Sequence, residues 1–123
     1  MNVDTTPVIL GDAESETAIY LRDALEADVR TDLSTWDGTT TVVHVRRIGG
    51  ARDRFIDRAR LVIDAHAPTR DEAFELANDA RGHLQAWPAI GAPCRGTGEE
   101  TGPTSLPVES QLPTVTMTWV VSI

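Results

Sequence analysis

The 123-residue sequence predicts an α+β fold: two helices on one face of a mostly antiparallel four-stranded sheet, in the chain order α-β-β-α-β-β. Two stretches repeat apolar side chains at helical spacing, and three stretches alternate apolar and polar side chains as strands do. Short fragments near residues 92–95 and 106–111 supply the remaining strand. Helices that lie together on one side of the sheet bury all of these apolar stripes.

The first helix is expected in "GDAESETAIYLRDALEADV". Asp12 is a candidate N-cap, and Glu14 and Glu16 follow in the first turn, where the helix dipole favours negative charge. One face then carries the apolar side chains of Ala18, Leu21, Leu25 and Val29. This spacing predicts an amphipathic helix.

Two strands are expected on either side of a basic segment. Residues 39–48 are rich in β-branched side chains, and residues 58–66 alternate strictly between apolar and polar ones. Gly49 and Gly50 are expected to end the first strand, and "GGARDR" is expected to be a short polar connector. The pair therefore predicts an antiparallel hairpin with basic residues on its tip and outer face.

The second helix is expected from Thr69, which stands three residues before Glu72 at the spacing of a capping box. Pro88 is expected to end it. Its apolar face consists of Ala73, Leu76, Ala77, Ala80, Leu84 and Trp87.

The C-terminal third is expected to contain a flexible loop and a final strand. The loop covers about residues 95–107, which are dense in Gly, Pro, Thr and Ser. Residues 114–123 alternate apolar and polar side chains, which predicts a strand with one buried face.

Length and composition favour a single soluble, non-secreted domain over residues 1–123. No apolar run approaches the roughly 20 residues that span a bilayer, and the N-terminus lacks the features of a signal peptide. We therefore expect no membrane partner. The net charge of −8 disfavours general binding to nucleic acid.

No arrangement of side chains predicts catalysis or a cofactor. His44, His66 and His83 lack the spacing of metal ligands, and Cys94 has no nearby histidine to activate it. Neither Gly49-Gly50 nor "GTG" at residues 96–98 has the context of a phosphate-binding loop. We expect a protein that is not an enzyme.

The basic segment is the strongest candidate site. Residues 46–60 hold six arginines and two aspartates in an otherwise acidic chain. One interpretation is a solvated face whose arginines pair with Asp53, Asp57 or Asp64. The other is an interface with the carboxylates of a second copy, a head-to-tail contact that closes into a ring. The candidate residues are Arg46, Arg47, Arg52, Asp53, Arg54, Arg58 and Arg60.

The sequence also resembles a known family. "RRIGG", "DRFIDRARL" and "TRDEAFELA", within a match over about residues 8–123, resemble the tail terminator proteins of long-tailed bacteriophages, especially phages of actinobacteria. The resemblance implies a homohexameric ring at the head-proximal end of the tail, made in the host cytoplasm. Such a ring caps the tail tube, stops its polymerisation and joins the tail to the head.

The implied partners are other copies of the chain, the major tail tube protein, the head-tail connector and genomic DNA passing through the lumen without specific recognition. The basic hairpin then faces either a neighbouring subunit or that lumen. The loop, with Gly98, Glu99 and Glu100, is a candidate docking segment for the tube or the connector, or a tolerated surface insertion. Two other functions stay open: another head-tail joining or tail-completion protein, and a small nucleic-acid-binding module that uses the hairpin.

Overall fold

The structure is a computed structural model that describes residues 12–53, 55–107 and 112–123. It confirms the α+β class, with two helices and a mostly antiparallel sheet, but the sheet has five strands where four were predicted. The elements in chain order are α1 (Ala13–Leu25), β1 (Val29–Arg30), β2 (Val42–Arg52), β3 (Asp57–His66), α2 (Arg70–Ile90), β4 (Gly96–Leu106) and β5 (Thr114–Ser122).

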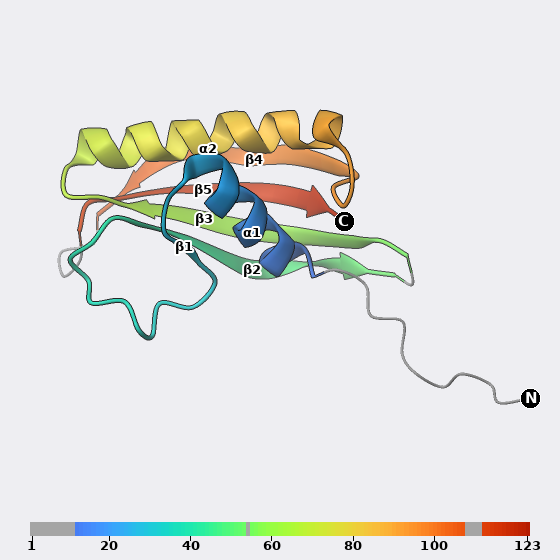
Figure 1. Ribbon diagram of the computed structural model, residues 1–123, viewed down its shortest axis with the longest axis horizontal. Coiled ribbons are helices and arrows are strands. Elements are labelled where there is room, and N and C mark those ends of the chain that lie inside the picture. Colours follow the sequence, from blue (N-terminus) through green and yellow to red (C-terminus); the bar gives the residue numbers. More distant parts are fainter. Residues whose placement is uncertain (1–11, 54, 108–111) are drawn as a thin grey trace, which may run out of the picture.

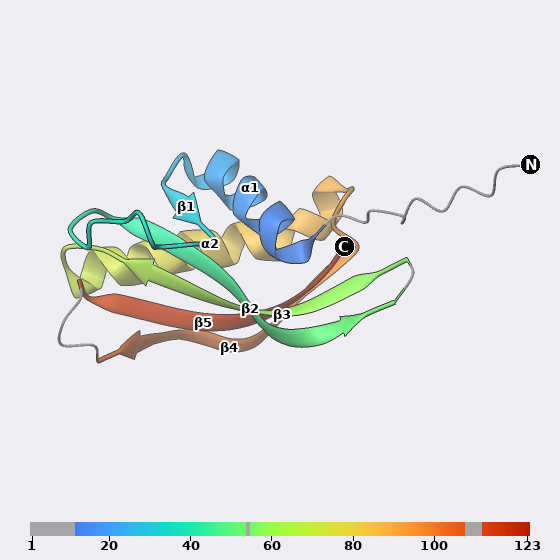
Figure 2. The ribbon, with the colours of Figure 1, turned by 90° about the horizontal axis from the view of Figure 1, so that it is seen from below.

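The sheet has the strand order β1-β2-β3-β5-β4. Every neighbouring pair is antiparallel except β1 and β2, which run parallel over two residues. Both helices lie on the same side of the sheet, and α2 runs along its length (Figures 1 and 2). The other face of the sheet has no helix over it in the described part of the chain. We call this the open face.

The core lies between the helices and the sheet. The central strands contribute Leu61 and Trp119, which are at most 1% exposed, and the helices contribute Leu21 and Leu84. The helices also contact each other, because Tyr20 stacks on the ring of Trp87 with centroids 4.3 Å apart. The predicted apolar stripes therefore meet in one layer.

The helix starts agree with the sequence, whereas the helix ends do not. The helix α1 ends at Leu25, so Val29, which was expected on its apolar face, lies in β1 instead. The side chain of Asp12 accepts a hydrogen bond from Glu14 N–H, and that of Thr69 accepts one from Glu72 N–H. The helix α2 continues through Pro88 to Ile90, although Pro88 was expected to end it. A proline at position 88 has no N–H to donate to the carbonyl of Leu84. The hydroxyl of Thr97 donates to that carbonyl instead, at 2.7 Å.

The two glycines after Ile48 do not end β2, contrary to expectation. The strand continues to Arg52, and a register shift between Arg47 and Gly49 marks a bulge. Gly50 has a φ of +101°, and a Cβ there would lie 2.0 Å from the carbonyl oxygen of Arg58. Glycine thus lets the strand bend without stopping.

The prediction of a flexible loop at residues 95–107 is wrong, because most of this segment forms β4. This strand pairs with β5 from Gly96 to Leu106, with irregularities between Glu99 and Thr101 and between Thr101 and Thr104. Its sequence lacks apolar alternation because it lies at the edge of the sheet, where few of its side chains enter the core. Pairing with β5 holds it in place.

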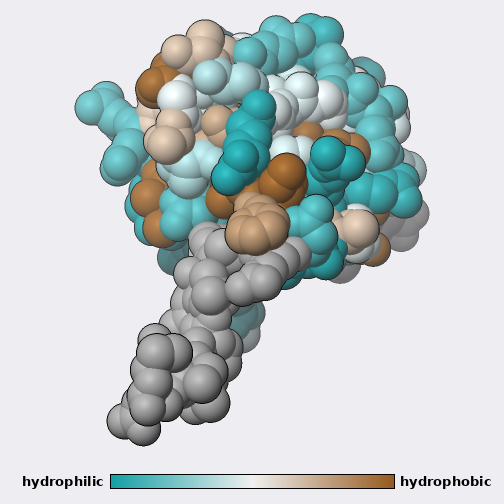
Figure 3. All heavy atoms as spheres, turned by 90° about the vertical axis from the view of Figure 1, so that its right-hand side faces the viewer, coloured by the Kyte–Doolittle hydropathy of each residue, from teal (hydrophilic) through white to brown (hydrophobic). Residues whose placement is uncertain are grey.

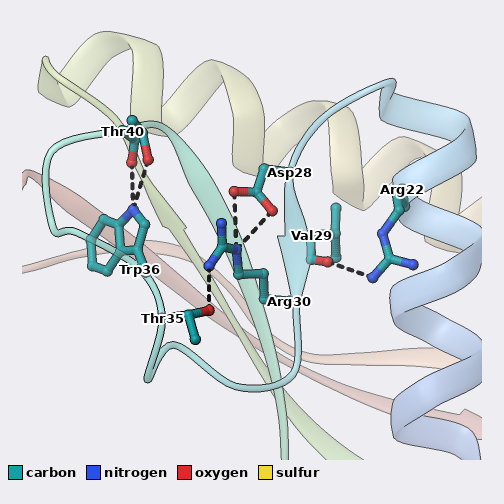
Figure 4. A network of polar contacts seen from close by, with 7 residues as sticks. All are labelled: Arg22, Asp28, Val29, Arg30, Thr35, Trp36 and Thr40. Carbon is teal, nitrogen blue, oxygen red and sulfur yellow. Dashed lines mark hydrogen bonds and ion pairs between the residues drawn. The ribbon is translucent and has the colours of Figure 1, made fainter.

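The added strand β1 is held by the polar contacts in Figure 4. Arg22 of α1 donates to the carbonyl of Val29, and Arg30 donates to the carboxylate of Asp28 and the hydroxyl of Thr35. Further along, the indole N–H of Trp36 donates to Thr40. These contacts tie the segment after β1 to itself and to the edge of the sheet.

Candidate assembly interface

The β2–β3 hairpin ends in a tight turn on the end of the molecule that Figure 3 faces. Oδ1 of Asp53 accepts hydrogen bonds from the N–H groups of Phe55 and Ile56, at 2.8 and 2.7 Å. These two hydrogen bonds lower the pKa of Asp53, and the bond from Phe55 has the larger effect. Phe55 is 66% exposed and Ile48 is 45% exposed. Apolar side chains thus lie among the hydrophilic ones on this end (Figure 3).

The structure divides the predicted interface arginines between the two faces of the sheet. Arg46 pairs with Val62 and thus points to the open face, as do Arg58 and Arg60 of β3. Arg47 pairs with Leu61 and points to the helix side. Arg47, also a candidate interface residue, therefore lies on the opposite face of the sheet from Arg46, Arg58 and Arg60.

Arg47 forms an ion pair with the buried carboxylate of Asp57. Its Nη1 lies 2.7 Å from Oδ1 and 2.8 Å from Oδ2 of Asp57, a residue with no exposed surface. Oδ2 also accepts a hydrogen bond from Ala13 N–H, at the start of α1. The backbone N–H of Arg47 donates to the carboxylate of Glu14 at 2.7 Å. Arg47 therefore serves the fold, because it fixes α1 to the hairpin.

Arg60 joins the hairpin to β4. Its guanidinium donates through Nε and Nη2 to the carboxylate of Glu100, at 3.0 and 2.8 Å. This two-bond geometry lowers the pKa of Glu100. Arg46 makes a longer contact, with Nε 3.8 Å from Oδ2 of Asp64. The contact of Arg46 with Asp64 is one that the solvated-face interpretation named, whereas the partner of Arg60 is Glu100, which that interpretation did not name.

The predicted docking residues lie in a strand, and the two glutamates point to opposite sides. Nε of Arg81, on α2, donates to both carboxylate oxygens of Glu99, each at 3.0 Å. Glu100 pairs with Arg60 on the open face. Gly98 pairs with Val120. The sequence treated the hairpin and residues 98–100 as separate sites, whereas the structure connects them.

The remaining candidate arginines are Arg52, Arg54 and Arg58. Arg52 is exposed at the end of β2, and Arg54 lies outside the described residues. Arg58 is exposed, and no described carboxylate lies within 4.0 Å of its guanidinium. Its charge, with that of Arg95, contributes to the low pKa of Asp53.

A buried polar group on the open face was missed by the sequence reasoning. Asp64 and His66 are 7% and 3% exposed, although strand alternation assigned both to the polar side. Trp36 lies over His66, with ring centroids 5.0 Å apart, and Thr114 Oγ1 lies 2.8 Å from Nδ1. Burial lowers the pKa of His66. The segment that carries Trp36 has no periodic pattern of apolar side chains, so no sequence signal indicated that it covers His66.

Within the described residues, no three His, Cys, Asp or Glu side chains are arranged to hold a metal ion. No described helix is both long enough and apolar enough to cross a membrane. Comparison with known proteins finds no matching protein-family model and no matching curated protein.

Proposed function

We propose that the chain is a subunit of a ring that caps the tail tube of a long-tailed bacteriophage and presents the surface that joins the tail to the head. The α+β fold, with helices on one side of a mostly antiparallel sheet, fits what the family resemblance implies. The resemblance supplies the particular assembly, and the charge distribution supports self-association.

The observation that carries the proposal is the uneven charge. Residues 46–60 hold six arginines and two aspartates, a net charge of +4. The other residues hold the remaining five arginines and seventeen acidic residues, a net charge of −12, which together give −8. One copy thus carries a basic region and an acidic remainder, and like regions repel while unlike ones attract. This favours a head-to-tail contact, which closes into a ring when the rotation between copies is suitable.

Arg58 is the arginine best suited to test the contact. It is exposed on the open face, and in the described structure no carboxylate holds its guanidinium. Arg58→Glu should leave the fold intact and reduce assembly at least about tenfold, because a carboxylate replaces a cation at an acidic partner surface. Arg70→Glu, at the start of α2, makes the same change in net charge and is the matched control.

The experiment combines light scattering, circular dichroism and electron microscopy of the chain with tail tubes of its phage. Closed rings at the head-proximal end of the tubes, lost in Arg58→Glu and kept in Arg70→Glu, support the proposal. Monomers both in solution and on tubes would overturn it. Location elsewhere in the neck would instead favour the other head-tail joining function.

The nucleic-acid alternative has less support from the structure. Arg46, Arg47 and Arg60 lie beside carboxylates, which partly neutralise the charge that phosphates would contact. If the hairpin nevertheless binds DNA as its function, binding to duplex DNA will weaken steeply between about 50 and 200 mM salt. Absence of such binding in a chain that forms rings favours the assembly role.

A further inference from the structure

Among the described residues, the sheet has open backbone edges on both sides at the same end. On one side, β1 covers β2 only at Val43 and His44, and Glu14 takes the N–H of Arg47, so the open edge of β2 begins beyond the bulge. On the other side, no described strand pairs with the outer edge of β4. Open edges of this kind are templates for pairing with another chain.

The two edges lie at the same level of the sheet. Gly50 pairs with Ala59, Ala59 pairs with Val121, and Val121 pairs with Thr97. Gly50 and Thr97 are thus the two ends of one row that crosses four strands. A second copy placed beside the first along this row brings its Thr97 next to Gly50.

The backbone groups at both ends of this row point outward. Asp57 and Ile123 exchange both of their backbone hydrogen bonds, at 2.9 Å. Because hydrogen-bonded and non-hydrogen-bonded pairs alternate along antiparallel strands, Ala59 and Val121 bond to each other in the same way. The N–H and C=O of their outer neighbours, Gly50 and Thr97, therefore point away from the sheet.

We infer that the β2 edge at residues 49–51 of one copy pairs with the β4 edge at residues 96–98 of the next, with Gly50 and Thr97 exchanging two backbone hydrogen bonds. This inference rests on the proposed ring and specifies how its subunits join. The strands β2 and β4 run in opposite directions within one sheet. Copies in the same orientation therefore pair antiparallel, and each uses a different edge, as a ring requires.

The side chains and bulges of both edges suit this contact. A Cβ added to Gly49, Gly96 or Gly98 would have no atom within 4 Å, so packing within one copy does not require glycine there. Glycine weakens a strand and often marks the close approach of another backbone. The irregularities of β4 begin after Glu99, at the level of Arg47, where Glu14 and then β1 occupy the edge of β2. Bulges bend a strand, so in the joined sheet they let β4 of one copy turn away from β1 of the next.

Charge agrees with the same pairing. Arg47, Leu61, Trp119 and Glu99 form one row, so the glutamates at 99 and 100 of one copy come beside Arg46 and Arg47 of the next. Arg47, Glu99 and Glu100 already have partners of opposite charge within one copy, so this row places charges of opposite sign beside one another without adding an unpaired charge.

Disulfide trapping tests the pairing directly. Ala51 and Gly96 are the two ends of the adjacent row, through Arg58 and Ser122. In the joined sheet they form a non-hydrogen-bonded pair with Cα atoms about 4.5 Å apart, within the range of a disulfide. Ala51→Cys with Gly96→Cys should give a ladder of cross-linked chains up to six on oxidation. Ala51→Cys with Thr104→Cys, which puts the second thiol at the far end of β4, is the matched control.

A second pair of variants tests the edge pairing without introduced cysteines. Thr97→Pro removes the outward N–H, and Thr97→Val keeps it, while both lose the hydroxyl that donates to Leu84. We expect Thr97→Pro to associate at least about tenfold more weakly than Thr97→Val at similar monomer stability, because it lacks one intersubunit hydrogen bond and its ring obstructs the edge.

The outcomes separate this inference from the proposed function. A ladder in the Gly96 pair alone, with weaker association of Thr97→Pro, supports the edge pairing. Rings that form without the ladder and equally in both Thr97 variants overturn the edge pairing and leave the ring. A folded chain that forms neither rings nor ladders, alone or on tubes, overturns both.

Discussion

The guanidinium of Arg47 lies 2.7 Å from a carboxylate oxygen of Asp57, which is fully buried and also accepts the N–H of Ala13. A single buried carboxylate thereby connects the two strands of the hairpin with the first turn of α1. Asp57 also pairs through its backbone with Ile123. The start of α1, the hairpin and the C-terminal residue therefore depend on one another.

Removal of one partner of this pair should destabilise the fold strongly. Arg47→Met leaves the carboxylate of Asp57 buried without its cation, which costs about 3 kcal/mol. Arg46→Met, at the neighbouring exposed position, should cost less than about 1 kcal/mol, because its contact with Asp64 is 3.8 Å long and about half of the Arg46 side chain is exposed to solvent. Urea unfolding measures both changes. Equal free energies of unfolding for the two variants would show that Asp57 does not depend on Arg47.

The two adjacent glycines of β2 should respond differently to alanine. Gly50→Ala is strained at a φ of +101° and brings its Cβ onto the carbonyl of Arg58, so we expect a loss of about 1–3 kcal/mol. Gly49→Ala meets no atom within 4 Å and should be neutral or slightly stabilising. Urea unfolding at concentrations where the chain is monomeric compares them. A smaller loss for Gly50→Ala than for Gly49→Ala would contradict the bulge geometry.

The sequence predicted the parts of the fold that depend on periodic apolar side chains. The core residues of both helices, and the alternation of β3 and β5, are visible without the structure because one face of each element is buried. The edge strand β4 was not predicted, because a strand such as "GTGEETGPTSL" buries few side chains and is held by backbone pairing. The two-residue β1 is likewise held by polar contacts that leave no periodic pattern.

The candidate site was predictable in composition and not in geometry. The count of arginines in residues 46–60 indicated the hairpin. The bulge after Arg47 decides how the residues beyond it pair with β3, and its position depends on the pairing of both strands. The partner of Arg60, Glu100, lies forty residues away, across β5. No local sequence signal reports a contact at that separation.

His66 should make stability depend on pH. Its pKa in the folded protein lies below the ordinary 6.5, because burial disfavours the charged imidazolium, and His44 adds to this while Asp64 opposes it. The unfolded chain therefore binds more protons between the folded pKa and about 6.5, so stability rises with pH in this window. Lowering the pH below about 6.5 should reduce the free energy of unfolding by up to about 1.4 kcal/mol per unit for this one proton.

Variants isolate the contribution of His66 from the other groups near it. The residues that face it are Asp64 on its own strand, His44 on β2, Thr114 on β5 and Trp36. His66→Gln should flatten the pH dependence between 7.5 and 5.5 in urea unfolding. His83→Gln, on α2, is the control and should keep the slope of the original chain. An unchanged slope in His66→Gln would mean that the imidazole already protonates in the folded state.

The strand β4 should resist proteolysis in the free subunit. A protease that cleaves after glutamate needs an unpaired segment at Glu99 and Glu100, whereas both residues lie in a strand paired with β5 and hold arginines. Cleavage there should therefore be limited by opening of the strand, as for other paired segments. A mobile loop, as the sequence suggested, would instead be cut rapidly.

Gly98→Pro provides the sensitive comparison for this last prediction. The alternation that directs Thr97 outward directs the N–H of Gly98 to Val120, so proline at 98 removes a hydrogen bond of the sheet. We expect cleavage after Glu99 or Glu100 to become at least about tenfold faster in Gly98→Pro, because each lost or strained bond of about 1 kcal/mol raises the population of the open strand. Thr97→Pro, whose lost N–H points away from β5, should accelerate it less. Mass spectrometry of the fragments over time measures the rates. Equal acceleration by both prolines would contradict the assigned direction of the backbone groups, and with it the row on which the intersubunit pairing depends.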